Sequence, residues 1–294
     1  MPNLLDIRRR IRSVKNTQQI TQAMKMVSAA KLRRAQEQAL AARPYAQRLG
    51  ELMGGLAAYL DPQELADTKL EGADWALGEL LVRRPVARRL VIAISTDSGL
   101  VGAFNANALK AGLAAAAGAE TQFAAVGRKA RDFFRRRGET LAFERVGLFA
   151  RTIDYEAARQ IAGEAMRLYA THAVDEVVVA GNEFKSVIQQ RIVTRRLLPM
   201  EAPEHKGEAR DYIFETAPAA LLAELLPRAI ETQVYRALLE SLAAEHAARM
   251  NAMEAATSNA GDLIDSLTLN MNRVRQAAIT KEIIEVVSGA SALG

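Results

Sequence analysis

The chain has 294 residues, a formal net charge of +5 and no cysteine. The absence of cysteine excludes disulfides, thiolate metal sites, cysteine nucleophiles and thiol redox switches. Half of the residues are hydrophobic but only 5% are aromatic, a balance that suits close helix packing better than a large conventional core. Charged residues make up 25% of the chain, which argues against wholesale disorder.

The sequence offers no segment that would carry the chain into or across a membrane. Its longest alanine-rich patch, residues 111–119, is broken by Gly112 and Gly118 and falls short of the roughly 18 apolar residues of a spanning helix. Arginines at positions 8, 9, 10 and 12 stand where a secretory signal would have its apolar block. We therefore expect a soluble, cytoplasmic protein.

The first element predicted is a helix over residues 3–59, about 80 Å long if it is helical throughout. Its apolar stripe is formed by Leu4, Ile7, Ile11 and Val14, and then by Ile20, Met24 and Val27. Pro44 has no backbone N–H, so we expect it to kink or split the helix.

The same helix is the basic element of the chain. Its first 40 residues hold nine Lys or Arg against Asp6 and Glu37, a net charge of +7. Such a surface is a solvated helix face, a binding surface for an acidic protein, or a nucleic-acid site. Nucleic acid is the least favoured, because no aromatic residue that could stack on bases precedes Tyr45.

Residues 60–87 are predicted to form a connector, and residues 88–215 a small α/β domain. Apolar runs such as 89–95 are typical of strands buried on both faces, and strands that alternate with helices indicate this class. The predicted strands are 89–95, 121–126, 140–146, 176–180, 186–199 and 212–215, and the predicted helices are 104–117, 128–137 and 154–172. Residues 201–210, with Pro203, Gly207 and several charges, are predicted to be a mobile loop.

A nearly glycine-free run from Pro218 to Ser288 predicts a second long helix. Its predicted apolar seam is Leu263, Leu267, Met271, Val274 and Ala278, which Asn259, Asn270, Asn272 and Gln276 interrupt. Helices of this length need a partner, and the economical partner is the other terminal helix. The predicted fold is an α/β domain inserted between two long terminal helices that form an antiparallel coiled coil, with domains at 1–59, 60–87, 88–215 and 216–294.

The segment TDSGLVGAFN, residues 96–105, is where an enzyme hypothesis would have to lie, because ligands of α/β sheets bind beyond the carboxyl ends of strands. Gly99 and Gly102 give only G-x-x-G, and no lysine follows as in a phosphate-binding loop. A tight strand-to-helix turn is therefore favoured over a nucleotide site.

Other candidate chemistry is sparse. His172, His205 and His246 lie far apart with no partner at metal-ligand spacing. Asp262 with Asp265, and Glu282 with Glu285, share helix faces at i,i+3, which favours a solvated or partner-binding face over acid–base catalysis. We expect no catalytic residue, no metal and no cofactor.

Four stretches in chain order carry a resemblance to a known family. LDIRRRIRSVKNTQQITQAMKMVSAAKLRRAQ, the RPYA that follows, TDSGLVGAFN and the terminal ITKEIIEVVSGASAL together resemble the gamma subunit of the rotary ATP synthase. The resemblance covers the whole chain, and its most specific part is I-T-x-E-x-x-E-x-x-x-G-A at residues 279–290. Relatives usually have cysteine where Val101 stands, a departure expected to affect packing only.

The resemblance implies a non-catalytic central-stalk rotor of a proton-translocating ATP synthase, on the cytoplasmic face of the cell inner membrane. Its implied partners are three alpha and three beta subunits around one gamma, the epsilon subunit and the c-ring of the membrane sector, with no nucleic acid. The positions implied to make coupling contacts with these partners are Met24, Lys25, Arg249, Arg275, Gln276, Thr280 and Glu282.

Two rival hypotheses remain on the residues alone. One is an α/β enzyme with a coiled-coil oligomerisation arm, which would show turnover in the isolated chain. The other is a basic coiled coil that binds nucleic acid, with a steep salt dependence. Read without the resemblance, the polar positions near the C-terminus are merely solvated. Neither rival accounts for the C-terminal motif.

Overall fold

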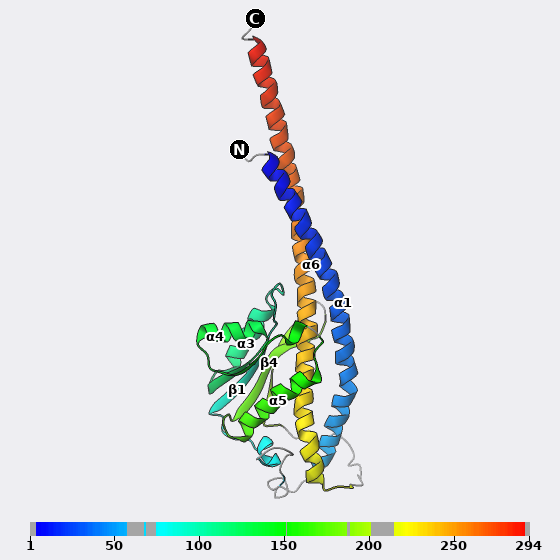
Figure 1. Ribbon diagram of the computed structural model, residues 1–294, viewed down its shortest axis with the longest axis vertical. Helices are drawn as coiled ribbons and strands as arrows, with labels where there is room; N and C mark the ends of the chain where they lie inside the picture. Colours follow the sequence, from blue (N-terminus) through cyan, green and yellow to red (C-terminus); the bar gives the residue numbers. More distant parts are fainter. Residues whose placement is uncertain are drawn as a thin grey trace. The chain divides into compact units, whose positions relative to one another are not determined.

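A computed structural model describes residues 4–57, 68, 75–150, 152–186, 189–200 and 215–291. The chain divides into two compact units. The first, called here the coil unit, combines Met1–Ala29 with Arg249–Gly294, and the second, the domain unit, is Ala30–Ala248. Two helices, α1 (Leu4–Ala57) and α6 (Pro218–Ser291), contribute to both units (Figure 1).

In the coil unit, α1 and α6 pack side by side and antiparallel. Gln18 donates a hydrogen bond to the carbonyl of Thr257, and Lys25 forms an ion pair with Glu254. Residue numbers therefore rise along α1 as they fall along α6. The covered positions of both helices are spaced by alternating three and four residues, the heptad spacing of a coiled coil. These seam positions are Ile7, Ile11, Val14, Gln18, Thr21, Lys25 and Ser28 on α1, and Met253, Thr257, Ala260, Ile264, Leu267, Met271 and Val274 on α6.

The seam differs from the predicted stripes at several positions. Leu267, Met271 and Val274 lie in it as predicted, but Ala278 is exposed, and Leu263 is 41% exposed while its neighbour Ile264 takes the covered position. On α1 the predicted stripe was wrong at Ile20 and Val27, which are 60% and 56% exposed, whereas Met24 is half-buried. A strict 3.5-residue repeat puts polar Gln18 and Thr21 in the covered positions instead.

The domain unit contains a five-stranded sheet in the order β3-β2-β1-β4-β5. β5 is an antiparallel edge strand, and the other four strands are parallel. The strands are β1 (Arg88–Ile94), β2 (Glu120–Val126), β3 (Leu141–Arg145), β4 (Glu176–Phe184) and β5 (Gln190–Leu198). The helices between them are α3 (Phe104–Ala115), α4 (Arg128–Arg137) and α5 (Tyr155–Ala170), with short 3-10 turns η1 (Leu77–Leu80) and η2 (Leu148–Ala150).

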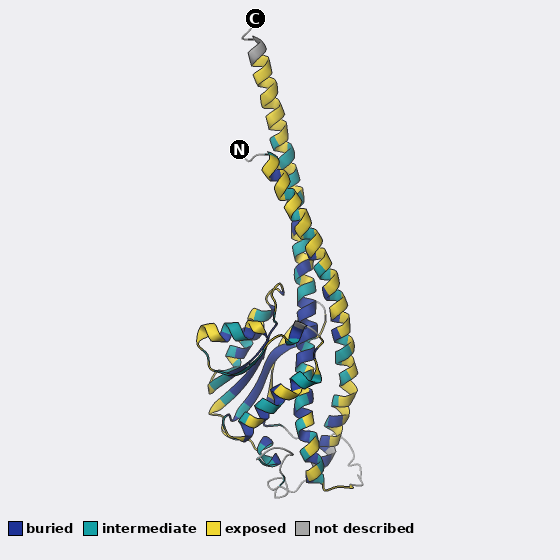
Figure 2. Cartoon of the chain, in the orientation of Figure 1, coloured by how far each residue is buried: buried dark blue, intermediate teal, exposed yellow. Residues whose placement is uncertain are grey.

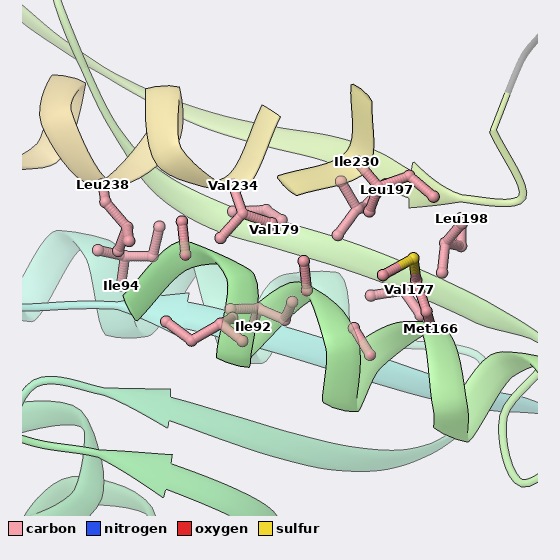
Figure 3. Close-up of a cluster of buried hydrophobic side chains, with 14 of the residues drawn as sticks. Ile92, Ile94, Met166, Val177, Val179, Leu197, Leu198, Ile230, Val234 and Leu238 are labelled. Carbon is pink, nitrogen blue, oxygen red and sulfur yellow. The ribbon is translucent and has the colours of Figure 1, made fainter. Parts of the chain in front are cut away.

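Helices cover both faces of the sheet, so the central strands β1, β2 and β4 carry buried apolar runs (Figure 1). On one face, α5 and residues 218–248 of α6 pack on β1, β4 and β5, where Ile92, Val179 and Leu197 meet Ile230 and Val234 (Figure 3). On the other face, α3 and α4 pack on β1 and β2 through a smaller cluster around Phe123 and Phe134. Residues 30–57 of α1 join the larger cluster through Leu32, Ala35, Leu49 and Met53.

The predicted fold class is confirmed, as are most of the predicted helices and strands. Pro44 was expected to kink or split the helix; the split is not seen, because α1 runs through Pro44 as one helix. Pro44 is exposed and so is Leu40, whose carbonyl would have bonded to the missing N–H, so water can satisfy that carbonyl. The strand predicted at 212–215 lies almost wholly, and the loop predicted at 201–210 wholly, outside the described residues.

Asp175 ties the start of β1 to the start of β4. Its Oδ2 accepts hydrogen bonds from the backbone N–H groups of Arg88 (2.8 Å) and Ala87 (3.2 Å), and its Oδ1 accepts one from the Arg88 guanidinium. Burial by itself would raise the pKa of Asp175, but these donors outweigh it and hold the pKa below its usual value. The stabilisation is therefore present above the unfolded pKa and is lost as pH falls through the lowered pKa.

No helix among the described residues is both long enough and apolar enough to span a bilayer.

Gly127, between β2 and α4, occupies a position that no other residue fits. Its φ is +93°, and a Cβ there would lie 2.8 Å from the carbonyl carbon of Ser95 and closer still to its oxygen. We predict that Gly127→Ala lowers the free energy of unfolding by about 3 kcal/mol or more, because the clash is with backbone. Chemical denaturation followed by the fluorescence of Trp75, which packs on the domain core, measures the change.

Gly163→Ala is the matched control, since Gly163 lies in helix α5 with nothing within 4 Å of its added Cβ. This substitution should stabilise the domain by about 0.5–1 kcal/mol. Equal effects of the two substitutions would contradict the packing described between β1 and α4.

Candidate functional site

The distinctive surface of the chain is the last part of α6. Every residue from Arg275 to Ser288 is exposed, and we call this segment the exposed tip (Figure 2). Seven of its fourteen residues are the helix formers Ala, Arg, Gln, Glu and Lys, and Lys281 Nζ lies 3.4 Å from Glu285 Oε1 in an i,i+4 ion pair. The tip is therefore helical through local interactions, without burial.

The exposed tip carries large apolar side chains that contact no core. Five of them are between 48% and 72% exposed: Ile279, Ile283, Ile284, Val286 and Val287. A run of exposed β-branched residues on a helix is a mark of a surface that another molecule covers. Within the coil unit, the α6 seam ends at Val274, so the described part of α1 leaves this surface uncovered.

The seven residues expected to make coupling contacts lie in two places. Arg275, Gln276, Thr280 and Glu282 are all on the exposed tip. Met24, Lys25 and Arg249 are half-buried in the paired part of the coil unit. Since Glu254, the partner of Lys25, precedes Arg275 by 21 residues, the two groups are about 30 Å apart along α6.

Several of these side chains already have partners within the chain. Lys25 forms its ion pair with Glu254 across the two helices, and its side chain is 36% exposed. The hydroxyl of Thr280 donates to the carbonyl of Gln276 at 2.9 Å, which leaves its oxygen lone pairs facing outward as acceptors. The exposed tip thus offers a mixed surface of isoleucines and valines beside hydrogen-bonding groups.

A polar layer in the coil seam was missed from the sequence. Thr21 and Thr257 approach each other to 2.8 Å between their hydroxyl oxygens, and Gln18 Nε2 donates to the carbonyl of Thr257 at 3.4 Å. The signal was available: the spacing that starts at Ile7 continues through these polar residues to Ser28. Reading only apolar residues hid it.

The turn after β1 uses its polar side chains to bind its own backbone. Asp97 accepts hydrogen bonds from the backbone N–H groups of Arg128 (3.0 Å), Gly147 (2.9 Å) and Phe149 (3.1 Å). Ser95 Oγ accepts from the N–H of Ala130 at 2.8 Å, in the first turn of α4 where a phosphate would bind in a nucleotide site. These contacts, and the carboxylate of Asp97, which would repel phosphate, support the tight-turn interpretation.

Val101 is 3% exposed and packs on Phe104, a packing role as expected.

A cavity of about 430 Å³ lies in the domain unit between α1, β5 and α6. Its charged residues pair with one another: Arg195 bridges Glu183 (2.7 Å) and Glu240 (3.4 Å), and Arg236 also binds Glu240. In the described part of the chain, no three His, Asp or Glu side chains are arranged to hold a metal ion. The paired charges of this cavity are engaged with one another, and we take the exposed tip as the candidate site.

Comparison with known proteins identifies the family. A family model described as ATP synthase matches residues 3–293. The chain is 53% identical to the ATP synthase gamma chain of Solibacter usitatus (strain Ellin6076), over 99% of both chains. The chain belongs to the ATP synthase gamma chain family. It is also 47% identical to the gamma chain of Pelotomaculum thermopropionicum over the full length of both chains.

Solved structures agree with this membership. The chain matches a chain of the Tetrahymena thermophila mitochondrial ATP synthase central stalk and c-ring with a TM-score of 0.60 and 25% identity, over 81% of this chain and 99% of that one. A chain of the Euglena gracilis mitochondrial ATP synthase matches with a TM-score of 0.66 at 19% identity, which shows the fold alone. This second match covers 99% of this chain and 94% of that one, so the shared fold includes residues of both units.

Ile283 provides a test of the exposed tip. Because its side chain is 57% exposed and contacts no core, we predict that Ile283→Asn changes the free energy of unfolding of the isolated chain by less than about 0.5 kcal/mol. Leu267→Asn, in the seam of the same helix, should destabilise the coil unit by about 2 kcal/mol. Helical circular dichroism during thermal unfolding measures both. A large loss at Ile283 would mean that the tip packs on the chain itself.

Proposed function

We propose that this chain is the rotor of the central stalk of a proton-translocating ATP synthase and has no active site of its own. In this proposal the coiled coil turns inside a ring of three alpha and three beta subunits, while the domain unit sits on the epsilon subunit and the c-ring. The complex would stand on the cytoplasmic face of the cell inner membrane. Full-length similarity to gamma chains supports the assignment.

The observation that carries the proposal is the exposed tip. Fourteen consecutive residues are helical and exposed although five of them are isoleucine or valine. The exposure of these apolar side chains to water costs free energy, and that cost is removed if apolar surfaces of other subunits surround the tip. A ring of larger subunits provides such surfaces, whereas a solvated arm does not require them.

Coupling follows from symmetry. One helical pair is not threefold symmetric, so it cannot contact three catalytic subunits in the same way at once. The subunit that meets a given face of the coil differs in contact free energy from the other two, and its nucleotide affinity differs accordingly. When the coil turns, each subunit passes through every state. The chain acts by these differential contacts.

The contacts themselves are assigned from the seven positions named above. Arg275, Gln276, Thr280 and Glu282 would contact the ring from the exposed tip, and Met24, Lys25 and Arg249 from the paired coil. The net charge of +7 over the first 40 residues would complement acidic loops of the beta subunits. Such complementarity gives orientation and specificity more than affinity. The division at 1–59, 60–87, 88–215 and 216–294 stays a prediction.

The test is native mass spectrometry of the chain mixed with alpha and beta subunits of its source, with ATPase measured on the same mixtures. We expect a complex of three alpha, three beta and one gamma. Alanine at Arg275, Gln276, Thr280 and Glu282 together should lower ATPase by about tenfold, which corresponds to about 1.4 kcal/mol of lost transition-state stabilisation. Truncation after Asn270 should weaken it at least as much.

Asp262→Ala with Asp265→Ala is the matched control, since both side chains are exposed on α6 before the tip. This variant should keep the activity of the parent complex. If no complex forms while the free chain turns over a substrate or binds nucleic acid, one of the two rival functions replaces this proposal.

A further inference from the structure

The polar layer of the coil unit follows an apolar part of the same seam. On α1, seam positions Ile7, Ile11 and Val14 are apolar, and Gln18, Thr21, Lys25 and Ser28 are polar. Thr21 is 8% exposed and Ser28 only 3%, so these polar groups belong to the packed interface. Polar groups at seam positions lower the stability of a coiled coil, but they can specify its register.

The polar layer is built around one pair of threonines. Their hydroxyl oxygens, Thr21 Oγ1 and Thr257 Oγ1, are 2.8 Å apart. Gln18 adds a hydrogen bond to the backbone carbonyl of Thr257, and Gly261 leaves room for it, because a Cβ there would lie 3.3 Å from Gln18 Nε2. The ion pair between Lys25 and Glu254 follows one turn away.

The two threonine hydroxyls must share one hydrogen bond between the helices. Thr21 Oγ1 is also 3.0 Å from the carbonyl of Gln18, and Thr257 Oγ1 is 2.7 Å from the carbonyl of Met253. Two hydroxyl protons are therefore available for three short oxygen–oxygen contacts. If both hydroxyls donated to the carbonyls of their own helices, the two hydroxyl oxygens would lie 2.8 Å apart with no proton between them. One hydroxyl therefore donates to the other across the interface.

Only one axial register brings the two hydroxyls into hydrogen-bonding contact with each other. If α1 slides by one seam layer, Thr21 comes to face Met253 or Ala260, and if it slides by a heptad it faces Met250 or Ile264. None of these four side chains carries an oxygen. The apolar layers of Ile7, Ile11 and Val14 would accept such slips, because isoleucine, valine, leucine and methionine replace one another with little change in packing.

We propose that Thr21 and Thr257, supported by Gln18, are positioning residues that lock the axial register of α1 against α6. This inference rests on the proposed rotor function. A slip of one seam layer moves α1 by about 5 Å along α6, and a heptad by about 10 Å. Either slip displaces Met24 and Lys25, on α1, relative to the exposed tip, on α6. The hydroxyl pair thus fixes the distance between Met24 and Lys25 on α1 and the exposed tip on α6, both of which would contact the ring.

The experiment uses the assembled complex with all subunits, in which Thr21→Val and Thr257→Val are introduced together. Valine keeps the shape of threonine and removes the hydroxyl. The chain has no cysteine, so engineered pairs report the register by disulfide formation. Carried along the helices, the observed register sets Val14 opposite Ile264, and one-layer slips set it opposite Ala260 or Leu267.

We expect the parent to cross-link Val14→Cys with Ile264→Cys, and the double valine variant to lose about half or more of this product to the slipped pairs. The ratio of protons pumped to ATP hydrolysed should fall in the same variant, while its thermal stability is unchanged or rises. A merely structural role would lower stability and leave this ratio alone. Thr21→Ser with Thr257→Ser keeps both hydroxyls and should restore the parent behaviour.

Thr17→Val with Thr268→Val is the matched control, since each hydroxyl donates to its own helix, to Ser13 and Ile264 respectively. It should behave as the parent. The single variant Thr21→Val also removes the bond between the two hydroxyls, so it should slip about as much as the double variant. The inference fails if the double valine variant keeps the parent register, or slips with no loss of coupling. Failure of the parent complex to assemble or pump would instead overturn the proposed rotor function.

Discussion

The pairing of α1 with α6 is the contact on which the rest of the chain depends. Helices of 54 and 74 residues are far longer than propensity alone supports in water, and each becomes stable by burying a seam on the other. In the coil unit that seam follows a 3.5-residue repeat, and in the domain unit the same helices bury Leu32, Met53 and Ile230 in a common core. Where the α6 seam ends, after Val274, the described part of α1 leaves an exposed surface that carries isoleucine and valine.

In the α/β domain, protein side chains occupy the edge of the sheet where ligands usually bind. In parallel sheets, ligands usually bind beyond the carboxyl ends of the strands. Here Asp97 and Ser95 occupy that edge with hydrogen bonds to the backbone around α4, and Gly127 allows the close approach that they need. The domain therefore retains a fold that often binds nucleotides while its polar groups serve stability. This is consistent with a subunit whose role is mechanical.

Much of the fold could be predicted because its signals are local. The strands are apolar runs between turn residues, and the helices around them begin and end at residues such as Asp154 and Gly138. The polar layer could not be found from apolar spacing, because Thr21 and Thr257 act through each other across 236 positions of sequence. The continuity of α1 at Pro44 depends on exposure to water, which the sequence does not reveal. The exposed tip residues follow from a family motif and their contacts remain a prediction.

The most direct test of the central claim is to watch single complexes turn. With the alpha and beta subunits fixed to a surface and a bead attached to the domain unit, ATP should drive rotation in one direction, with three equally spaced pauses per turn that reflect the ring. Removal of the exposed tip should weaken the torque. Steady ATP hydrolysis by the assembled complex with a stationary bead would contradict the account, because the coil would then be a fixed support.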